Sequence, residues 1–136
     1  MYPSDKLPVA LLFGGAGAEH EISCRSAAYV GGVFERSGVP TLYVGIDRRG
    51  APRLCDGAEI GEDRPPVFPV RLGEESGFFR GGEILPVGSA FPILHGDRGE
   101  DGEIQGALKA AGIPFVGCGV FAGAVAADKC AAKRLA

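Results

Sequence analysis

The sequence predicts an α/β domain built on a doubly wound, mostly parallel sheet. Residues 9–13 form an unbroken apolar run, typical of a strand buried on both faces, and Gly14, Gly15 and Gly17 follow it at once. From Glu19 onward, apolar residues recur at helical spacing, with acidic side chains in the first turn, where the helix dipole favours negative charge. A strand, a glycine turn and a helix form the opening unit of such a domain.

The next elements continue the same pattern. Gly38 and Pro40 are expected to end the first helix near Ser37, because glycine accepts a left-handed cap and proline cannot continue a helix. Residues 41–46 then form a second strand. The polar turn after it allows residues 51–54 to pair back as a hairpin.

Between residues 50 and 90 the sequence predicts an irregular insertion with short β-strands. Apolar pieces at 66–72 and 84–87 alternate with glycine, proline, glutamate and arginine. A buried strand is expected again at 90–94, although Pro92 cannot donate to a strand ladder.

The last third of the chain predicts three helices and one short strand. Asp101 can cap a helix over residues 102–111, and a short strand is expected at 115–116. An alanine-rich helix over 120–127 is expected to be buried. Asp128 can cap a final helix.

Composition excludes several classes of function. At 136 residues the chain fits one compact domain of about 100–150 residues. The net charge is −3 and no run of Lys or Arg exceeds two residues, so nucleic acid is not an expected partner. The amino terminus has neither a basic leader nor an apolar run long enough for a signal or a membrane span, which predicts a cytoplasmic protein without a membrane partner. The four cysteines are widely spaced and are expected to be reduced apolar residues, not zinc ligands.

The glycine turn is the first candidate binding site. A dinucleotide fingerprint would need glycine or alanine where His20 stands, and Glu19 and Glu21 would repel a pyrophosphate at the helix entrance. An ammonium group fits the turn better. The alternative is that both acids only complement the helix dipole.

A second candidate segment begins at His95, directly after a predicted strand. Parallel strands place their carboxyl ends on one edge, so residues 14–19 and 95–101 should converge, with 117–119 as a third candidate segment. A Glu19 carboxylate can hold an ammonium group, and a His95 imidazole can donate to a carboxylate, so the pair suits a small zwitterion. The alternative is that His95 only fixes its own loop.

Four segments together resemble a known family. They are LFGGAGAEHEIS at 12–23, HGDRGEDGEIQG at 95–106, AGIPFVGCGV at 111–120 and ADKCAAKRL at 127–135. In this order they resemble the amino-terminal part of D-alanine–D-alanine ligases, a family that includes the D-alanine–D-lactate and D-alanine–D-serine ligases of vancomycin resistance. The resemblance does not extend to residues 55–89.

The resemblance implies an ATP-grasp enzyme of peptidoglycan precursor synthesis. In that family ATP phosphorylates the carboxylate of one D-alanine and the amine of a second attacks it, with magnesium neutralising the phosphate. Residues 1–126 would be a Rossmann-like substrate domain and 127–136 the start of a link into an ATP-grasp domain. The chain would then be an amino-terminal fragment, inactive alone, of a protein expected to be a homodimer. The magnesium ligands and the pocket for the second substrate would lie beyond it.

The resemblance also implies roles for individual residues. Glu19 looks like the glutamate that binds the ammonium of the first D-alanine, and His95 like the histidine near its carboxylate. Gly14 and Gly15 are expected to form the close turn beside the substrate.

Two further residues carry implied roles outside this pair. Glu100 would support the loop by hydrogen bonding, and Lys129 would reach the ATP phosphates. By composition alone Lys129 is a solvated lysine. Arg25 and Arg98 are expected to be surface charges.

Two rival functions stay open: a non-catalytic amino-acid-binding or regulatory module on the same scaffold, and a dinucleotide-binding domain, which Glu19 disfavours.

Overall fold

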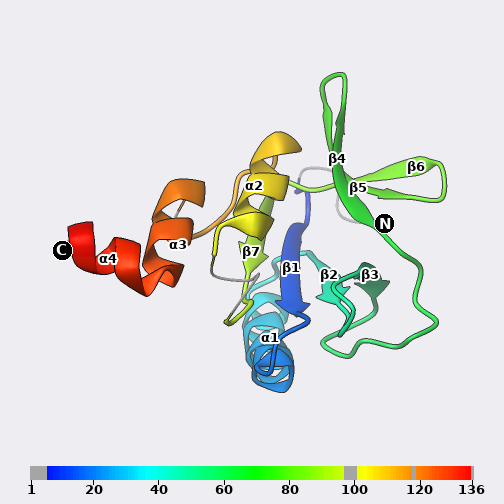
Figure 1. The fold of residues 1–136 in the computed structure, drawn as a ribbon. Coiled ribbons are helices and arrows are strands. Elements are labelled where there is room, and N and C mark those ends of the chain that lie inside the picture. Colours follow the sequence, from blue (N-terminus) through cyan, green and yellow to red (C-terminus); the bar gives the residue numbers. More distant parts are fainter. Residues whose placement is uncertain (1–5, 97–100, 118, 136) are drawn as a thin grey trace.

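The chain forms a mixed α/β fold in which one sheet contains both parallel and antiparallel strands (Figure 1). The structure is a computed structural model, and it describes residues 6–96, 101–117 and 119–135. Within these residues no helix combines the length and the apolar character that crossing a membrane requires.

The main sheet has the strand order β3–β2–β1–β7. The first strand, β1 (Val9–Gly14), pairs in parallel with β2 (Thr41–Ile46) on one side and with β7 (Ser89–Pro92) on the other. The edge strand β3 (Pro52–Cys55) is antiparallel to β2, as the predicted hairpin required. Later strands of the chain therefore lie on both sides of β1: β2 and β3 on one side and β7 on the other.

The side chains of β1 alternate between two apolar layers. Leu11 and Phe13 pack with Ala27 of α1 (His20–Arg36), which covers one face of the sheet. Ala10 and Leu12 point to the other face, where α2 (Glu103–Ala110) and the second sheet close the larger core. Because β1 is buried on both faces, its sequence is a continuous apolar run and does not alternate.

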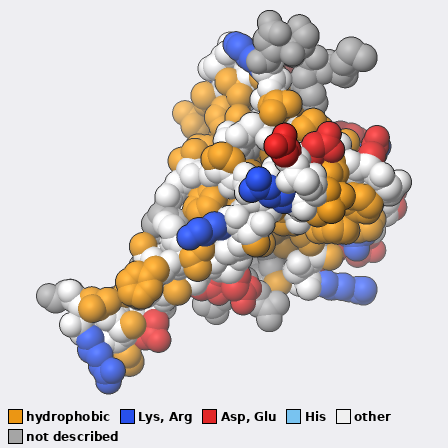
Figure 2. Space-filling view, turned by 90° about the horizontal axis from the view of Figure 1, so that it is seen from above, with side chains coloured by type: hydrophobic (Ala, Val, Ile, Leu, Met, Phe, Trp, Pro, Cys, Tyr) orange, Lys and Arg blue, Asp and Glu red, His pale blue; other side chains and the backbone are white. Residues whose placement is uncertain are grey.

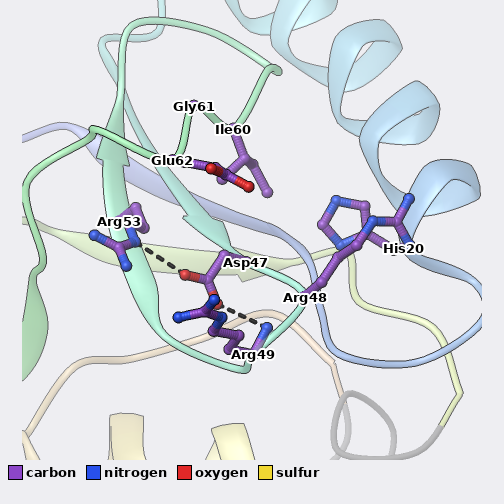
Figure 3. Close-up of a pocket in the computed structure, with 8 residues that line it drawn as sticks. All are labelled: His20, Asp47, Arg48, Arg49, Arg53, Ile60, Gly61 and Glu62. Carbon is purple, nitrogen blue, oxygen red and sulfur yellow. Dashed lines mark hydrogen bonds and ion pairs between the residues drawn. The ribbon is translucent and has the colours of Figure 1, made fainter.

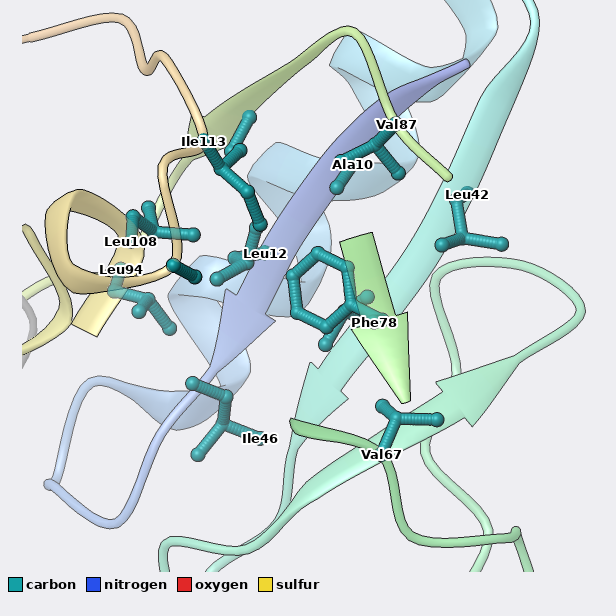
Figure 4. Close-up of a cluster of buried hydrophobic side chains, with 13 residues drawn as sticks. Ala10, Leu12, Leu42, Ile46, Val67, Phe78, Val87, Leu94, Leu108 and Ile113 are labelled. Atoms are coloured by element: carbon teal, nitrogen blue, oxygen red, sulfur yellow. The ribbon is translucent and has the colours of Figure 1, made fainter. Parts of the chain in front are cut away.

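The insertion is more regular than the sequence predicted. It forms a three-stranded antiparallel sheet of β4 (Phe68–Leu72), β5 (Glu75–Arg80) and β6 (Glu83–Pro86). The central strand β5 was not predicted, because it opens with polar residues and glycine. Its Phe78 is fully buried and lies in the middle of the larger core, facing Leu12 (Figure 4).

The expected strand at 115–116 is reduced to a single parallel bridge between Phe115 and Ala90. The strand predicted at 90–94 ends at Pro92, yet pairing with β1 continues for one bond, because Ile93 N–H donates to the Leu12 carbonyl at 2.8 Å. The predicted cap of the last helix is confirmed, because Asp128 accepts from the N–H groups of Cys130 and Ala131. The other helix begins one residue later than predicted, with Gly102 at the N-cap position, and Asp101 accepts from the Glu103 N–H at 3.0 Å from just outside it.

The prediction of a buried helix over 120–127 is wrong. The helix α3 (Val120–Ala127) exists, but its Phe121 is 76% exposed, and α4 (Lys129–Leu135) has no buried residue. Apolar side chains and basic side chains stand together on the arm at the lower left of Figure 2, the side on which α3 and α4 extend in Figure 1. Alanine richness predicted an apolar surface correctly, but the described residues supply too little neighbouring surface to cover it.

Three cysteines lie within the described residues, and all three are free thiols: Cys24, Cys55 and Cys130. Burial raises the pKa of the Cys24 and Cys55 thiols above the ordinary value. Both thiols therefore stay protonated at neutral pH, as expected of reduced apolar residues. Cys118 lies outside the described residues.

Candidate functional site

The carboxyl end of β1 makes a turn that only glycine can form. Gly14 and Gly15 have φ angles of 92° and 104°, in the left-handed region that L side chains rarely adopt. A Cβ atom on Gly14 would overlap the Ile46 carbonyl oxygen and come within 2.6 Å of Ile60 Cδ1. The Gly15 N–H donates to the same Ile46 carbonyl at 2.8 Å, which ties the turn to the end of β2.

Two buried polar side chains of α1 hold this turn. His20 Nδ1 lies 2.6 Å from the Gly15 carbonyl oxygen, so that nitrogen carries the proton and donates. Ser23 is 0% exposed; its Oγ accepts from the Gly14 N–H at 2.8 Å and donates to the Ile93 carbonyl at 2.6 Å. Sequence reasoning noticed His20 only because it breaks the dinucleotide fingerprint, and it missed Ser23. Their spacing of three residues, which places both on one face of the helix, was the available signal.

Glu19 and His95 lie on adjoining segments of this edge. Glu19 is exposed and directly precedes α1, and His95 follows β7 half-buried, with its Nε2 shielded from solvent. A Cβ atom placed on Gly96 would lie 3.7 Å from both Cδ and Oε2 of Glu19. On the inner side, Leu94 Cδ2 would lie 3.8 Å from a Cβ on Gly15. The first two segments predicted to converge therefore lie side by side.

The two glutamates at the helix entrance have different neighbours. Glu21 forms an exposed salt bridge with Arg48, with 3.2 Å between Oε1 and Nη2, whereas the Glu19 carboxylate lies against Gly96. Both acids lie near the amino terminus of α1, where the dipole favours them. Only Glu19 also lies on the shared edge next to His95.

Lys129, a further predicted site residue, is not brought to this edge. Lys129 is the first residue of α4 and is exposed, and Figure 1 shows α4 at the outer end of the molecule, away from the turn after β1. Glu100 and Arg98 lie outside the described residues. The segment that begins at residue 117 leads into α3. The start of α3 packs on the start of α2, because a Cβ on Gly102 would come within 2.6 Å of the Val120 carbonyl oxygen.

A cavity of about 310 Å³ is lined in part by His20, whose ring bonds the glycine turn after β1 (Figure 3). It lies between α1, the β2–β3 turn and the segment that follows β3. Figure 3 shows His20 and Arg48 on one side of the cavity and Arg53 on the opposite side. Its lining carries both signs of charge, because it includes two acids and three arginines. The lining residues are His20, Asp47, Arg48, Arg49, Arg53, Ile60, Gly61 and Glu62.

Asp47 organises the floor of this cavity. Its carboxylate accepts from the backbone N–H groups of Arg49 and Ala51, each at 2.9 Å, and from Arg53 Nε at 3.0 Å. Burial alone would raise the pKa of Asp47. The hydrogen bonds from Ala51, Arg53 and Arg49 outweigh burial and hold that pKa below its ordinary value.

Across the ranges 6–96, 101–117 and 119–135, no three His, Cys, Asp or Glu side chains are grouped so that they could hold a metal ion. The described groups at the candidate site are a carboxylate, an imidazole and a glycine turn. Such groups can hold the two ends of a small zwitterion.

Comparison with known proteins identifies the family. A family model described as "D-ala D-ala ligase N-terminus" matches residues 8–118. The chain belongs to this family. The D-alanine–D-alanine ligase motifs at the turn after β1 and at His95 thus lie on the edge described above, within the matched region.

Relatives of this ligase family match the chain over almost its whole length. A D-alanine–D-alanine ligase of Methylobacterium sp. is 44% identical, covering 93% of this chain and 36% of that protein. A putative D-alanine–D-lactate ligase of Streptomyces coelicolor is 40% identical, covering 91% of this chain and 38% of that protein. The crystal structure of the VanG D-Ala:D-Ser ligase from Enterococcus faecalis superposes with a TM-score of 0.86 at 32% identity, over 96% of this chain and 41% of that one. The chain therefore spans about two fifths of the length of these relatives.

Proposed function

We propose that this chain is the amino-terminal, substrate-binding part of an ATP-dependent ligase that joins D-alanine to a second small molecule in peptidoglycan precursor synthesis. The observation that carries the proposal is the position of the Glu19 carboxylate against Gly96, the neighbour of His95, in a family of D-alanine ligases. The three relatives described above bear the names of D-alanine, D-lactate and D-serine ligases, so the second substrate stays open.

Glu19 would bind the ammonium group of the first D-alanine. Its carboxylate is exposed at the helix entrance, and among the residues that the structure describes it forms no salt bridge like that of Glu21 with Arg48, which suits an incoming cation. His95 would orient the carboxylate of the same D-alanine, because its imidazole can donate to an anion. Two charged ends held on two adjoining segments would fix which carboxylate oxygen faces the reacting partner.

Gly14 and Gly15 would form the wall of the substrate site nearest the sheet. Without side chains they leave the backbone open to close approach, and their positive φ angles turn the chain from β1 toward Glu19. The bonds from His20 and Ser23 hold that wall in place before the substrate arrives.

ATP and Mg²⁺ would supply the phosphoryl group and neutralise its charge. Lys129 would contribute a cation toward the ATP phosphates, and Glu100 would support the His95 loop. An exposed lysine at the start of α4 fits a contact to a phosphate that approaches from outside this chain. The described residues offer no acidic cluster for the metal, so its ligands would come from the remainder of the protein.

The proposal also covers the organisation of the protein. Residues 1–126 would be a doubly wound, Rossmann-like substrate domain, and 127–136 the start of a link to an ATP-grasp domain. The position of β1 between two parallel neighbours supports this, because in such sheets ligands bind at the carboxyl ends of the strands, at the point where the strand order reverses. The complete protein would be cytoplasmic. It would also be a homodimer, an oligomeric state that analytical ultracentrifugation would test.

The direct test is an assay of the complete protein for D-alanyl-D-alanine, with ATP and Mg²⁺. We expect Glu19→Gln to raise the KM for D-alanine by about a hundredfold, as loss of a charge-assisted contact to a charged ligand costs about 1.5–3 kcal/mol. Glu21→Gln is the matched control, two residues away and at the same helix entrance, and should leave the KM within about twofold. Equal effects of the two substitutions would contradict the role of Glu19.

A second arm uses the 136-residue chain alone. It should form no dipeptide and bind D-alanine weakly, because nucleotide and metal ligands are proposed to lie elsewhere. ATP-dependent dipeptide formation by these residues alone would refute that. If the complete protein binds D-alanine but never consumes ATP, the binding-module alternative is favoured.

A further inference from the structure

The hydrogen-bond ladder between β1 and β7 is interrupted at the edge that carries the site. Ile93 N–H donates to the Leu12 carbonyl at 2.8 Å, as parallel pairing requires. In an uninterrupted parallel ladder, the next bond would join the Gly14 N–H directly to the Ile93 carbonyl. Here the Ser23 hydroxyl lies between them, accepting from Gly14 at 2.8 Å and donating to Ile93 at 2.6 Å.

This hydroxyl joins the two backbone segments that carry the proposed substrate site. Gly14 begins the glycine turn, and Ile93 is two residues before His95. The backbone N–H of Ser23 also donates to the Glu19 carbonyl at 3.0 Å. Ser23 is fully buried, so water does not compete for these bonds. The Ser23 side chain thus fixes the glycine turn relative to the approach to His95, and it does so from the first turn of α1.

We propose that Ser23 is a positioning residue, whose hydroxyl separates the ends of β1 and β7 and thereby sets the distance between Glu19 and His95. This inference rests on the proposed function, because the distance matters only if both residues hold one substrate. Without the hydroxyl, Gly14 and Ile93 either stay unpaired or close onto each other. Both outcomes change the separation of the two segments and misfit a small zwitterion.

The test compares three variants of the complete protein. Ser23→Ala removes the hydroxyl, and Ser23→Cys keeps the side-chain shape with a weak donor. Ala27→Gly, buried one turn further along α1, lowers helix stability and leaves the three bonds intact, so it serves as the stability-matched control. For each variant we measure the KM for D-alanine, the KM for ATP, and hydrogen exchange of residues 12–16.

We expect Ser23→Ala to raise the KM for D-alanine by about tenfold and to leave the KM for ATP within about twofold, with faster exchange at 12–16. Ser23→Cys should fall between Ser23→Ala and the wild type. A purely structural role would move both KM values together, as we expect of Ala27→Gly, and that result for Ser23→Ala would overturn the inference. Unchanged exchange in Ser23→Ala would also overturn it, and this readout needs no activity. A wild type that fails to use D-alanine would instead refute the proposed function.

Discussion

The two ends of this chain are built in different ways. Around β1 and α1 the polar groups find their partners inside the chain, as the bonds of Ser23 and His20 show, and Phe13 is fully buried. At the carboxyl end, α3 and α4 leave Phe121 and Leu135 exposed. The turn after β1 is therefore fixed by bonds within this chain, although Ile22 and Tyr29 of α1 are 55% and 73% exposed. In α3 and α4 the described residues leave apolar side chains uncovered, which is typical of an interaction surface.

The largest expected contrast comes from one substitution made in both regions. In the 136-residue chain, Phe13→Ala should cost about 3–5 kcal/mol of unfolding free energy, because it leaves a cavity in the core. Phe121→Ala should change it by less than about 0.5 kcal/mol. Urea denaturation followed by circular dichroism measures both. If Phe121→Ala is costly only in the complete protein, the remainder of the protein covers α3; equal costs in this chain would contradict the contrast.

Backbone strain gives the next largest difference. Gly14→Ala should destabilise the chain by about 2–4 kcal/mol, from a disfavoured φ angle and from the clash with the Ile46 carbonyl. Gly38→Ala is the control, because Gly38 also has a positive φ of 70° but has open space around a Cβ. It should cost about 1 kcal/mol. Thermal denaturation of the two variants would show whether crowding, and not φ alone, reserves position 14 for glycine.

A smaller difference separates two aspartates that both accept backbone N–H groups. Asp47→Asn should lower stability by about 1–2 kcal/mol at pH 7, since it removes a charged acceptor of three hydrogen bonds. Asp128→Asn should cost under about 0.5 kcal/mol, because asparagine caps a helix equally well and α4 buries no residue.

The pH dependence sharpens this comparison. The folded-state pKa of Asp47 is lowered, so its contribution is present above the unfolded value of about 3.9 and is lost as pH falls through the folded value. The gap between wild type and Asp47→Asn should therefore shrink as unfolding is measured from pH 7 down to pH 3. A gap that is constant over this range would show that the charge of Asp47 does not contribute.

Sequence patterns located the elements whose packing is local and periodic. The apolar run of β1, the span of β2 and the Asp128 cap were predicted, since each depends on neighbouring residues. The strand β5 was missed because its pairing with β4 and β6 is decided by tertiary contacts of Phe78. The exposure of α3 could not be predicted, because hydrophobicity does not say whether a covering surface is present.

The candidate site was only partly accessible in the same way. Chain order and parallel pairing placed Glu19 and His95 on one edge, and the family motif singled them out. The spacing of His20 and Ser23 places both on one face of α1, but it does not show their roles, because a buried serine or histidine in a helix has the same sequence pattern whatever backbone group it bonds. Only the distances to Gly14, Gly15 and Ile93 show those bonds.

A crystal structure of the complete protein with D-alanine is the most direct test of whether Glu19 and His95 hold one ligand. We expect its ammonium nitrogen within about 3.2 Å of a Glu19 carboxylate oxygen, with its carboxylate on the imidazole of His95. D-alanine bound elsewhere, or in contact with only one of the two side chains, would contradict the account.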